Sequence, residues 1–198
     1  MTSSQGSVWN APNIITMARI AIVPVFAWAL LAEDGESVTW RLAALAVFGV
    51  AAASDRLDGY LARKNDLVTD LGKILDPIAD KVLIGTALVL LSVLGDLWWW
   101  VTVTILFREL AITAMRFLVL RYAVMPASRG GKLKTVLQSV GIAVMLLPLD
   151  HLPDVVTWLA AAIMGAALVV TVVTGVDYAA QGWRVRVAGR ASTVPTER

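Results

Sequence analysis

Six long apolar segments, joined by short polar connections, constrain the fold of this chain more than any other feature. They cover approximately residues 13–31, 40–63, 71–94, 98–122, 133–147 and 155–178. A helix needs about 20 mostly apolar residues to cross a bilayer. Charged residues make up only 16% of the 198 residues, and hydrophobic residues make up 58%, whereas soluble domains carry about 25% charge. We therefore expect an all-α integral membrane protein with six transmembrane helices.

The composition also bounds the domain organisation and the partners. We expect one membrane domain over residues 13–180, with a short N-terminal segment (1–12) before it and a basic tail (181–198) after it. The chain has no cysteine, which excludes disulfides and thiolate metal sites. The formal net charge of +2 is too small to favour a nucleic acid as a partner.

The charges of the connections predict the topology. Basic residues flank the second and fourth connections and recur in the tail: Arg63, Lys64, Lys73, Arg121, Arg129, Lys132, Lys134, Arg184, Arg186, Arg190 and Arg198. Acidic residues dominate the alternate connections, with Arg41 as the exception: Glu33, Asp34, Glu36, Asp96, Asp150 and Asp154. Because basic connections stay on the inner side of the membrane, both termini are expected in the cytoplasm.

Four aspartates interrupt the apolar pattern. Asp55 and Asp58 lie three residues apart at the end of the second segment, and Asp76 and Asp80 lie four apart near the start of the third. These spacings put each pair on one face of its helix, close to the cytoplasmic tip of a helical hairpin. Carboxylates are costly in a membrane, and hard oxygen ligands suit Mg²⁺, Ca²⁺ or Mn²⁺. A plainer alternative is pairing of the aspartates with the nearby basic residues Arg56, Arg63, Lys73 and Lys81.

The aspartates belong to a longer pattern, Asp55-x2-Asp58-Gly59-x2-Ala62-Arg63-x8-Gly72-x3-Asp76-x3-Asp80. This pattern resembles, at every defined position, the signature of the CDP-alcohol phosphatidyltransferase family. Small residues such as Gly59, Ala62 and Gly72 would let a nucleotide approach the backbone closely. Arg63 can hold a phosphate by a bidentate contact.

The resemblance extends outside the signature. Residues 12–19, 107–116 and 128–138 resemble the first helix, the fourth helix and the loop into the fifth helix of bacterial phosphatidylglycerophosphate synthases, in particular of actinobacterial members. Asn13, Thr16 and Arg19 recur every three residues in the first of these segments and share one face of a helix.

The resemblance implies a reaction. In such enzymes two divalent ions, Mg²⁺ or Mn²⁺, are held by the aspartates, here Asp55, Asp58, Asp76 and Asp80, and bind CDP-diacylglycerol. The acceptor would be sn-glycerol 3-phosphate and the products phosphatidylglycerol phosphate and CMP, with Asp80 as the general base. The resemblance also implies a homodimer. With the predicted topology, we expect a protein of the bacterial inner membrane whose active site faces the cytoplasm.

Two further residue sets follow from this reading. The expected CDP-lipid-binding residues are Asn13, Thr16, Gly59, Ala62, Arg63 and Gly72. The cations expected to bind the acceptor phosphate are Arg108, Arg116, Lys132 and Lys134.

Plainer roles remain open for several of these residues. Asn13 and Thr16 could form hydrogen bonds between helices. Arg108 could form an internal ion pair with Glu109, and the two lysines could serve as topology signals that attract anionic lipid.

Other functions also remain open. The same enzyme class could use inositol phosphate, serine or phosphatidylglycerol as the acceptor, because the signature binds the shared CDP-lipid half. A divalent-cation transporter would be expected to carry its acids near mid-bilayer on broken, repeated helices. An intramembrane prenyltransferase also uses aspartates and Mg²⁺, but its aspartate motifs are usually well separated in the sequence.

Overall fold

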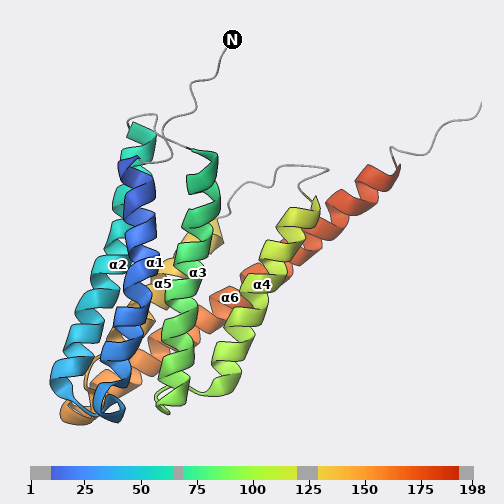
Figure 1. The fold of residues 1–198 in the computed structure, drawn as a ribbon. Helices are drawn as coiled ribbons and strands as arrows, with labels where there is room; N and C mark the ends of the chain where they lie inside the picture. The colour runs from blue at the N-terminus through green and yellow to red at the C-terminus, as the bar shows by residue number, and fades with distance from the viewer. Residues whose placement is uncertain (1–9, 65–68, 120–128, 192–198) are drawn as a thin grey trace, which may run out of the picture. The chain divides into compact units, whose positions relative to one another are not determined.

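The computed structural model describes residues 10–64, 69–119 and 129–191 of the chain, and within these ranges every regular element is a helix (Figure 1). The side chains of residues 56–64, 70–71, 73–74, 116–119, 129 and 181–191 lie outside the description. The prediction of an all-helical chain is thus confirmed for the described residues.

Six long helices appear in the predicted order. They are α1 (Ala11–Leu31), α2 (Val38–Lys64), α3 (Asp70–Val93), α4 (Trp99–Val119), α5 (Arg129–Met145) and α6 (Asp154–Ala191). Two short 3-10 turns, Ala32–Gly35 and Leu149–His151, lie in the connections that precede α2 and α6.

Two helix boundaries differ from the sequence prediction. α5 begins at Arg129, four residues before the predicted start, so Lys132 lies in its first turn and not before the helix. α6 continues past Tyr178 to Ala191. Each glycine in a helix costs only about 1 kcal/mol relative to alanine. The glycine pair at 130–131 and the glycines after Tyr178 therefore do not stop helices that other residues favour.

Three stretches among the described residues are long and apolar enough to cross a membrane. They are Ala11–Gly35, Val38–Asp55 and Asp154–Ala180. Much of their apolar surface points outward, as the exposed side chains of Val50, Trp158 and Val173 illustrate. An outward apolar surface is what a lipid-facing helix requires. Spanning by the other three helices remains a prediction.

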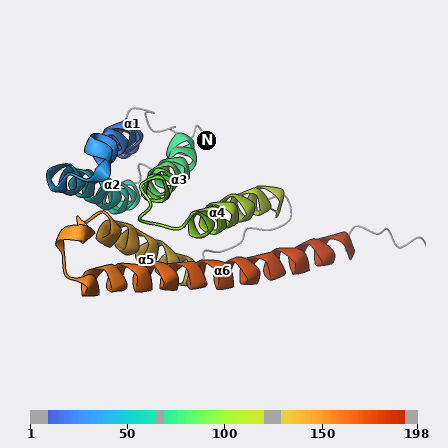
Figure 2. The same ribbon diagram turned by 90° about the horizontal axis from the view of Figure 1, so that it is seen from below.

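The chain divides into two compact units. One contains Met1–Leu97 and Ile142–Ala160, and the other contains Trp98–Gly141 and Ala161–Arg198. In the first unit α1 packs along both α2 and α3 (Figures 1 and 2). Phe26 of α1 and Phe48 of α2 meet in this core with ring centroids 5.9 Å apart. This packing brings α1 against the two helices that carry the aspartates.

Side-chain caps fix where α1 and α3 begin. The side chain of Asn10 accepts a hydrogen bond from the backbone N–H of Asn13 at 2.9 Å. The hydroxyl of Thr69 accepts one from the backbone N–H of Gly72 at 3.1 Å. Each cap satisfies a backbone donor that has no partner within its own helix.

Arg41, the exception to the predicted charge pattern, is buried at the other end of the first unit. Its Nη2 donates to Asp96 at 2.7 Å and its Nε to the carbonyl of Gly35 at 2.5 Å. Its Nη1 lies 3.5 Å and 3.4 Å from the carbonyls of Met145 and Leu147. One guanidinium therefore ties together the connections after α1, α3 and α5, which explains a basic residue on an otherwise acidic side.

Candidate metal and substrate site

The polar face of α1, formed by Asn13, Thr16 and Arg19, is buried. Asn13 is 2% exposed, Thr16 is 0% and Arg19 is 2%. The predicted common face is confirmed, because all three side chains contact residues that lie on or immediately before α2 and α3. A buried polar side chain is costly unless it is hydrogen-bonded, and each of these has a partner.

Arg19 pairs with the first signature aspartate. Its Nη1 lies 2.7 Å from Oδ1 of Asp55, and its Nε lies 3.3 Å from the hydroxyl of Ser54. The Arg19 side chain is 1% exposed, whereas that of Asp55 is 44% exposed. The carboxylate is therefore held from the protein side and remains accessible from the other side.

Thr16 contacts the third signature aspartate. Its hydroxyl donates to Oδ1 of Asp76 at 2.8 Å and also lies 3.1 Å from the carbonyl of Pro12 in its own helix. A hydroxyl has one proton to donate. The shorter bond to a charged acceptor is the stronger of the two, so we assign the proton to Asp76.

Gly72 lies where α1 approaches the start of α3. A Cβ atom at this position would be 2.7 Å from Oδ1 of Asn13 and 3.2 Å from the hydroxyl of Thr69. The carboxamide of Asn13 is fixed there, because its Nδ2 donates to that hydroxyl at 2.9 Å. The absence of a side chain at Gly72 thus permits contact between α1 and α3. The sequence reading expected it to permit the approach of a nucleotide.

The donor set fits a hard divalent ion in its chemistry. Asp55, Asp76 and Asp80 supply only carboxylate oxygens, which Mg²⁺ and Mn²⁺ prefer. Among the side chains that the structure describes, no three acidic or histidine residues form a group that could hold a metal ion.

Several signature residues lie outside the described side chains. They are Asp58, Ala62 and Arg63, together with the surroundings of Gly59. The predicted four-carboxylate set is therefore represented only in part.

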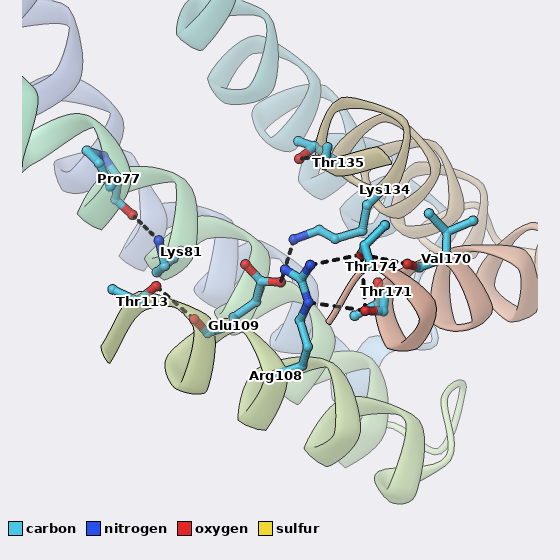
Figure 3. A network of polar contacts seen from close by, with 11 residues as sticks. Pro77, Lys81, Arg108, Glu109, Thr113, Lys134, Thr135, Val170, Thr171 and Thr174 are labelled. Carbon is cyan, nitrogen blue, oxygen red and sulfur yellow. Dashed lines mark hydrogen bonds and ion pairs between the residues drawn. The ribbon is translucent and has the colours of Figure 1, made fainter. Parts of the chain in front are cut away.

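The second unit contains a separate network centred on Arg108 of α4 (Figure 3). Its Nε donates to the carbonyl of Thr171 at 3.1 Å, and its Nη2 donates to the hydroxyl of Thr174 at 2.8 Å. Its Nη1 pairs with Glu109 at 3.0 Å. A Cβ at Gly175 would be 3.0 Å from Cγ of Arg108. Arg108 thus joins α4 to α6, and three of its five N–H groups are occupied by these contacts.

Glu109 is shared by two of the predicted acceptor cations. Its Oε1 accepts both from Arg108 and from Nζ of Lys134, which is buried in the first turns of α5 (Figure 3). Lys132, in contrast, is exposed. The side chain of Arg116 lies outside the described residues. The open pairing alternative for Arg108 and Glu109 is therefore confirmed as a contact, and it involves Lys134 as well.

Sequence reasoning missed the role of Arg19. The residue was recognised as part of a polar face but was not included among the site residues. An arginine within an apolar helix is expected to have an acidic partner. That rule identifies Arg19 as a candidate partner of one of the aspartates, although only the fold shows that the partner is Asp55.

Comparison with known proteins now identifies the family. Residues 9–173 match the CDP-alcohol phosphatidyltransferase family, and the chain belongs to it. The three apolar stretches and this membership make the chain a membrane protein.

Relatives with assigned names cover most of the chain. A probable phosphatidylglycerophosphate synthase of Mycobacterium tuberculosis (strain H37Rv) is 48% identical over 185 residues, which are 92% of this chain and 86% of the relative. A CDP-diacylglycerol–glycerol-3-phosphate 3-phosphatidyltransferase of Bacillus subtilis is 36% identical over 188 residues, covering 89% and 96%. A protein of the same name from Rickettsia typhi is 36% identical over 178 residues, covering 85% and 94%.

Proposed function

We propose that this protein transfers the phosphatidyl group of CDP-diacylglycerol to sn-glycerol 3-phosphate, giving phosphatidylglycerol phosphate and CMP in phospholipid biosynthesis. The observation that carries the proposal is 36% identity, over 89% of this chain, to a protein whose name specifies both substrates. The contacts from α1 to Asp55 and Asp76 support it, because they bring carboxylates of the family signature from α2 and α3 to one helix.

The four aspartates would hold the ions in this proposal. Asp55 and Asp58 on α2 and Asp76 and Asp80 on α3 are the proposed ligands of two divalent ions, Mg²⁺ or Mn²⁺. When bound, such ions neutralise the diphosphate and stabilise the charge that develops on the phosphoryl group and on the departing CMP. Arg63 and the small residues Gly59 and Ala62 are the proposed nucleotide-binding elements of α2.

The reaction forms one bond and breaks one bond. The acceptor hydroxyl oxygen attacks the phosphorus next to diacylglycerol, and the bond from that phosphorus to the CMP oxygen breaks. Asp80 takes the proton of the attacking hydroxyl as the general base. A phosphodiester forms, and CMP leaves with the electrons of the broken bond.

The acceptor phosphate needs cations. We propose that Arg108, Arg116, Lys132 and Lys134 supply them. Among the described contacts, Arg108 uses three of its five N–H groups, so a structural contact and a substrate contact are compatible for this residue. Glu109 fixes Arg108 and Lys134 together, which preorganises two positive charges for an anionic group.

The proposed setting is the bacterial inner membrane. We propose six spans, both termini in the cytoplasm, an active site open to the cytoplasm, and a homodimeric assembly. The charge pattern of the connections supports this orientation. It would place the aspartates within reach of a soluble acceptor and of a lipid in the inner leaflet.

An acceptor panel tests the proposal. Purified full-length protein receives CDP-diacylglycerol, Mg²⁺ or Mn²⁺, and one labelled alcohol at a time, and both CMP and labelled lipid are measured. We expect labelled lipid with sn-glycerol 3-phosphate only, and no turnover after chelation of the cation. Turnover with inositol phosphate, serine or phosphatidylglycerol would change the acceptor. No CMP release with any of the four alcohols would reject the proposed reaction.

A further inference from the structure

The polar face of α1 contributes none of the signature residues, yet it contacts two of the signature aspartates. Thr16 bonds to Asp76 on α3, and Arg19 bonds to Asp55 on α2. We propose that Asn13, Thr16 and Arg19 are positioning residues that set the carboxylates of Asp55 and Asp76 for the divalent ions. This proposal depends on the proposed function in one respect, which is that these carboxylates bind divalent ions.

Burial argues against direct contact of this face with the CDP-lipid. Thr16 is 0% exposed, and Asn13 and Arg19 are each 2% exposed. A side chain with so little accessible surface cannot contact a substrate unless α1 moves away from its neighbours. The expected CDP-lipid-binding role of Asn13 and Thr16 is therefore replaced in this proposal by an action through the aspartates.

Thr16 fixes the orientation of one carboxylate. A carboxylate has two oxygens, so an oxygen that accepts from the Thr16 hydroxyl at 2.8 Å leaves the second oxygen to ligate an ion. Groups that hold a metal ligand in this way commonly change the metal affinity by about ten- to a hundredfold when they are removed.

Arg19 fixes the other carboxylate and supplies charge. Its guanidinium is planar and remains protonated, and it holds Oδ1 of Asp55 at 2.7 Å. Four carboxylates at one site repel one another before an ion binds. A buried cation on the protein side reduces that repulsion, so the aspartates can stay close together in the empty site.

Asn13 and Gly72 complete the arrangement. The carboxamide of Asn13 contacts the hydroxyl of Thr69, which caps α3. A Cβ at Gly72 would be 2.7 Å from Oδ1 of Asn13, and real Cβ contacts are essentially never that short. Gly72 therefore allows α1 to come close enough to α3 for Thr16 to reach Asp76.

The first test measures Mn²⁺ binding to full-length protein in detergent micelles without substrate, by electron paramagnetic resonance. Thr16→Val keeps the shape and removes the hydroxyl, and we expect the Kd for Mn²⁺ to rise about ten- to a hundredfold. Thr16→Ser restores a hydroxyl and should bind nearly as the natural protein does. The matched control is Thr104→Val on α4, since the Thr104 hydroxyl bonds only to Trp100 of its own helix in the described contacts, and its Kd should not change.

The second test uses Gly72. Gly72→Ala should weaken Mn²⁺ binding because its new methyl group collides with Asn13. Adding Asn13→Ala removes the closest colliding group, although the Thr69 hydroxyl stays 3.2 Å from the new Cβ. Gly72→Ala should therefore weaken Mn²⁺ binding less in the Asn13→Ala background than in the natural protein.

The outcomes separate this proposal from the proposed function. An unchanged Mn²⁺ affinity in Thr16→Val, or in Gly72→Ala, overturns the positioning role. It does so most clearly if only the KM for CDP-diacylglycerol rises. The proposed function is judged independently by turnover of the natural protein in the acceptor panel. Thr16→Ser keeps the test valid if the valine variant fails to fold, because weak Mn²⁺ binding by a folded serine variant also contradicts the proposal.

Discussion

Replacing Arg41 with methionine is expected to destabilise the first unit strongly. The Arg41 side chain is 7% exposed, and that of its partner Asp96 is 20% exposed. The substitution keeps much of the apolar stem but removes the charge and the donors. It leaves the Asp96 carboxylate partly buried without its cation, and it removes the donor to the Gly35 carbonyl.

The structure sets the size of this effect. Removing one partner of a buried ion pair costs about 3 to 5 kcal/mol. We take about 3 kcal/mol, at the lower end of that range, because a fifth of the Asp96 side chain keeps contact with solvent. The turn before α2 adds to the expected loss, since Glu33 and Asp34 hold positive φ angles of 53° and 54° beside Gly35. For a chain of this size, about 3 kcal/mol corresponds to a fall of about 6 to 12 °C in Tm.

The pH dependence of the effect has a defined sign. Burial raises the pKa of Asp96 above its ordinary 3.8, and the Arg41 charge opposes that rise. A raised pKa in the folded state means that the stabilising contribution is complete below 3.8 and is lost as the pH rises through the folded pKa. Without Arg41 the pKa of Asp96 in the folded state rises further, so the variant loses stability over a wider range of pH. The loss of Tm in the variant should therefore be smaller at about pH 4, where mainly the hydrogen bonds of Arg41 to backbone carbonyls are missing, than at about pH 7, where Asp96 also lacks its cation.

Thermal unfolding in detergent, followed by circular dichroism at both pH values, measures the effect. Lys132→Met is the matched control, because it removes an exposed cation and should shift the free energy of unfolding by about 0.5 kcal/mol or less. The double variant Arg41→Met with Asp96→Leu should recover part of the loss, since no unpaired carboxylate remains. The role of the Arg41–Asp96 pair would be refuted if Arg41→Met lowered the Tm no more than Lys132→Met does. It would also be refuted if Arg41→Met lowered the Tm equally at both pH values.

The remaining predictions concern the reaction. Replacing any one signature aspartate by asparagine should abolish CMP release without changing the far-UV circular dichroism spectrum; the variants are Asp55→Asn, Asp58→Asn, Asp76→Asn and Asp80→Asn. The control is Asp154→Asn, which changes an exposed carboxylate. Full activity in one of the four variants excludes that residue from the ion site. Arg108→Ala should raise the KM for glycerol 3-phosphate about ten- to a hundredfold, as the loss of a hydrogen bond to a charged group worth about 1.5 to 3 kcal/mol implies, with a smaller change for CDP-diacylglycerol. Equal losses for both substrates, matched by Thr174→Val, would instead make Arg108 a structural link between α4 and α6.

The sequence by itself determined the helices and the candidate chemistry. Apolar runs of spanning length and their polar breaks are local properties, and all six helices lie in the predicted order. The fixed spacing of Asp55, Asp58, Asp76 and Asp80 is also local, and it predicted the family that the comparison then showed. Helix ends were less certain because end preferences are weak: α5 begins earlier and α6 ends later than predicted.

Only the tertiary structure decided which polar residues meet. Thr16 and Asp76 are 60 positions apart, and Arg19 and Asp55 are 36 apart, so no local pattern specifies these pairs. The same holds for Arg41 with Asp96 and for Arg108 with Thr174, which are 55 and 66 positions apart. A buried charged or hydroxyl group must find a partner because it has lost water. The packing of the helices determines which partner is within reach.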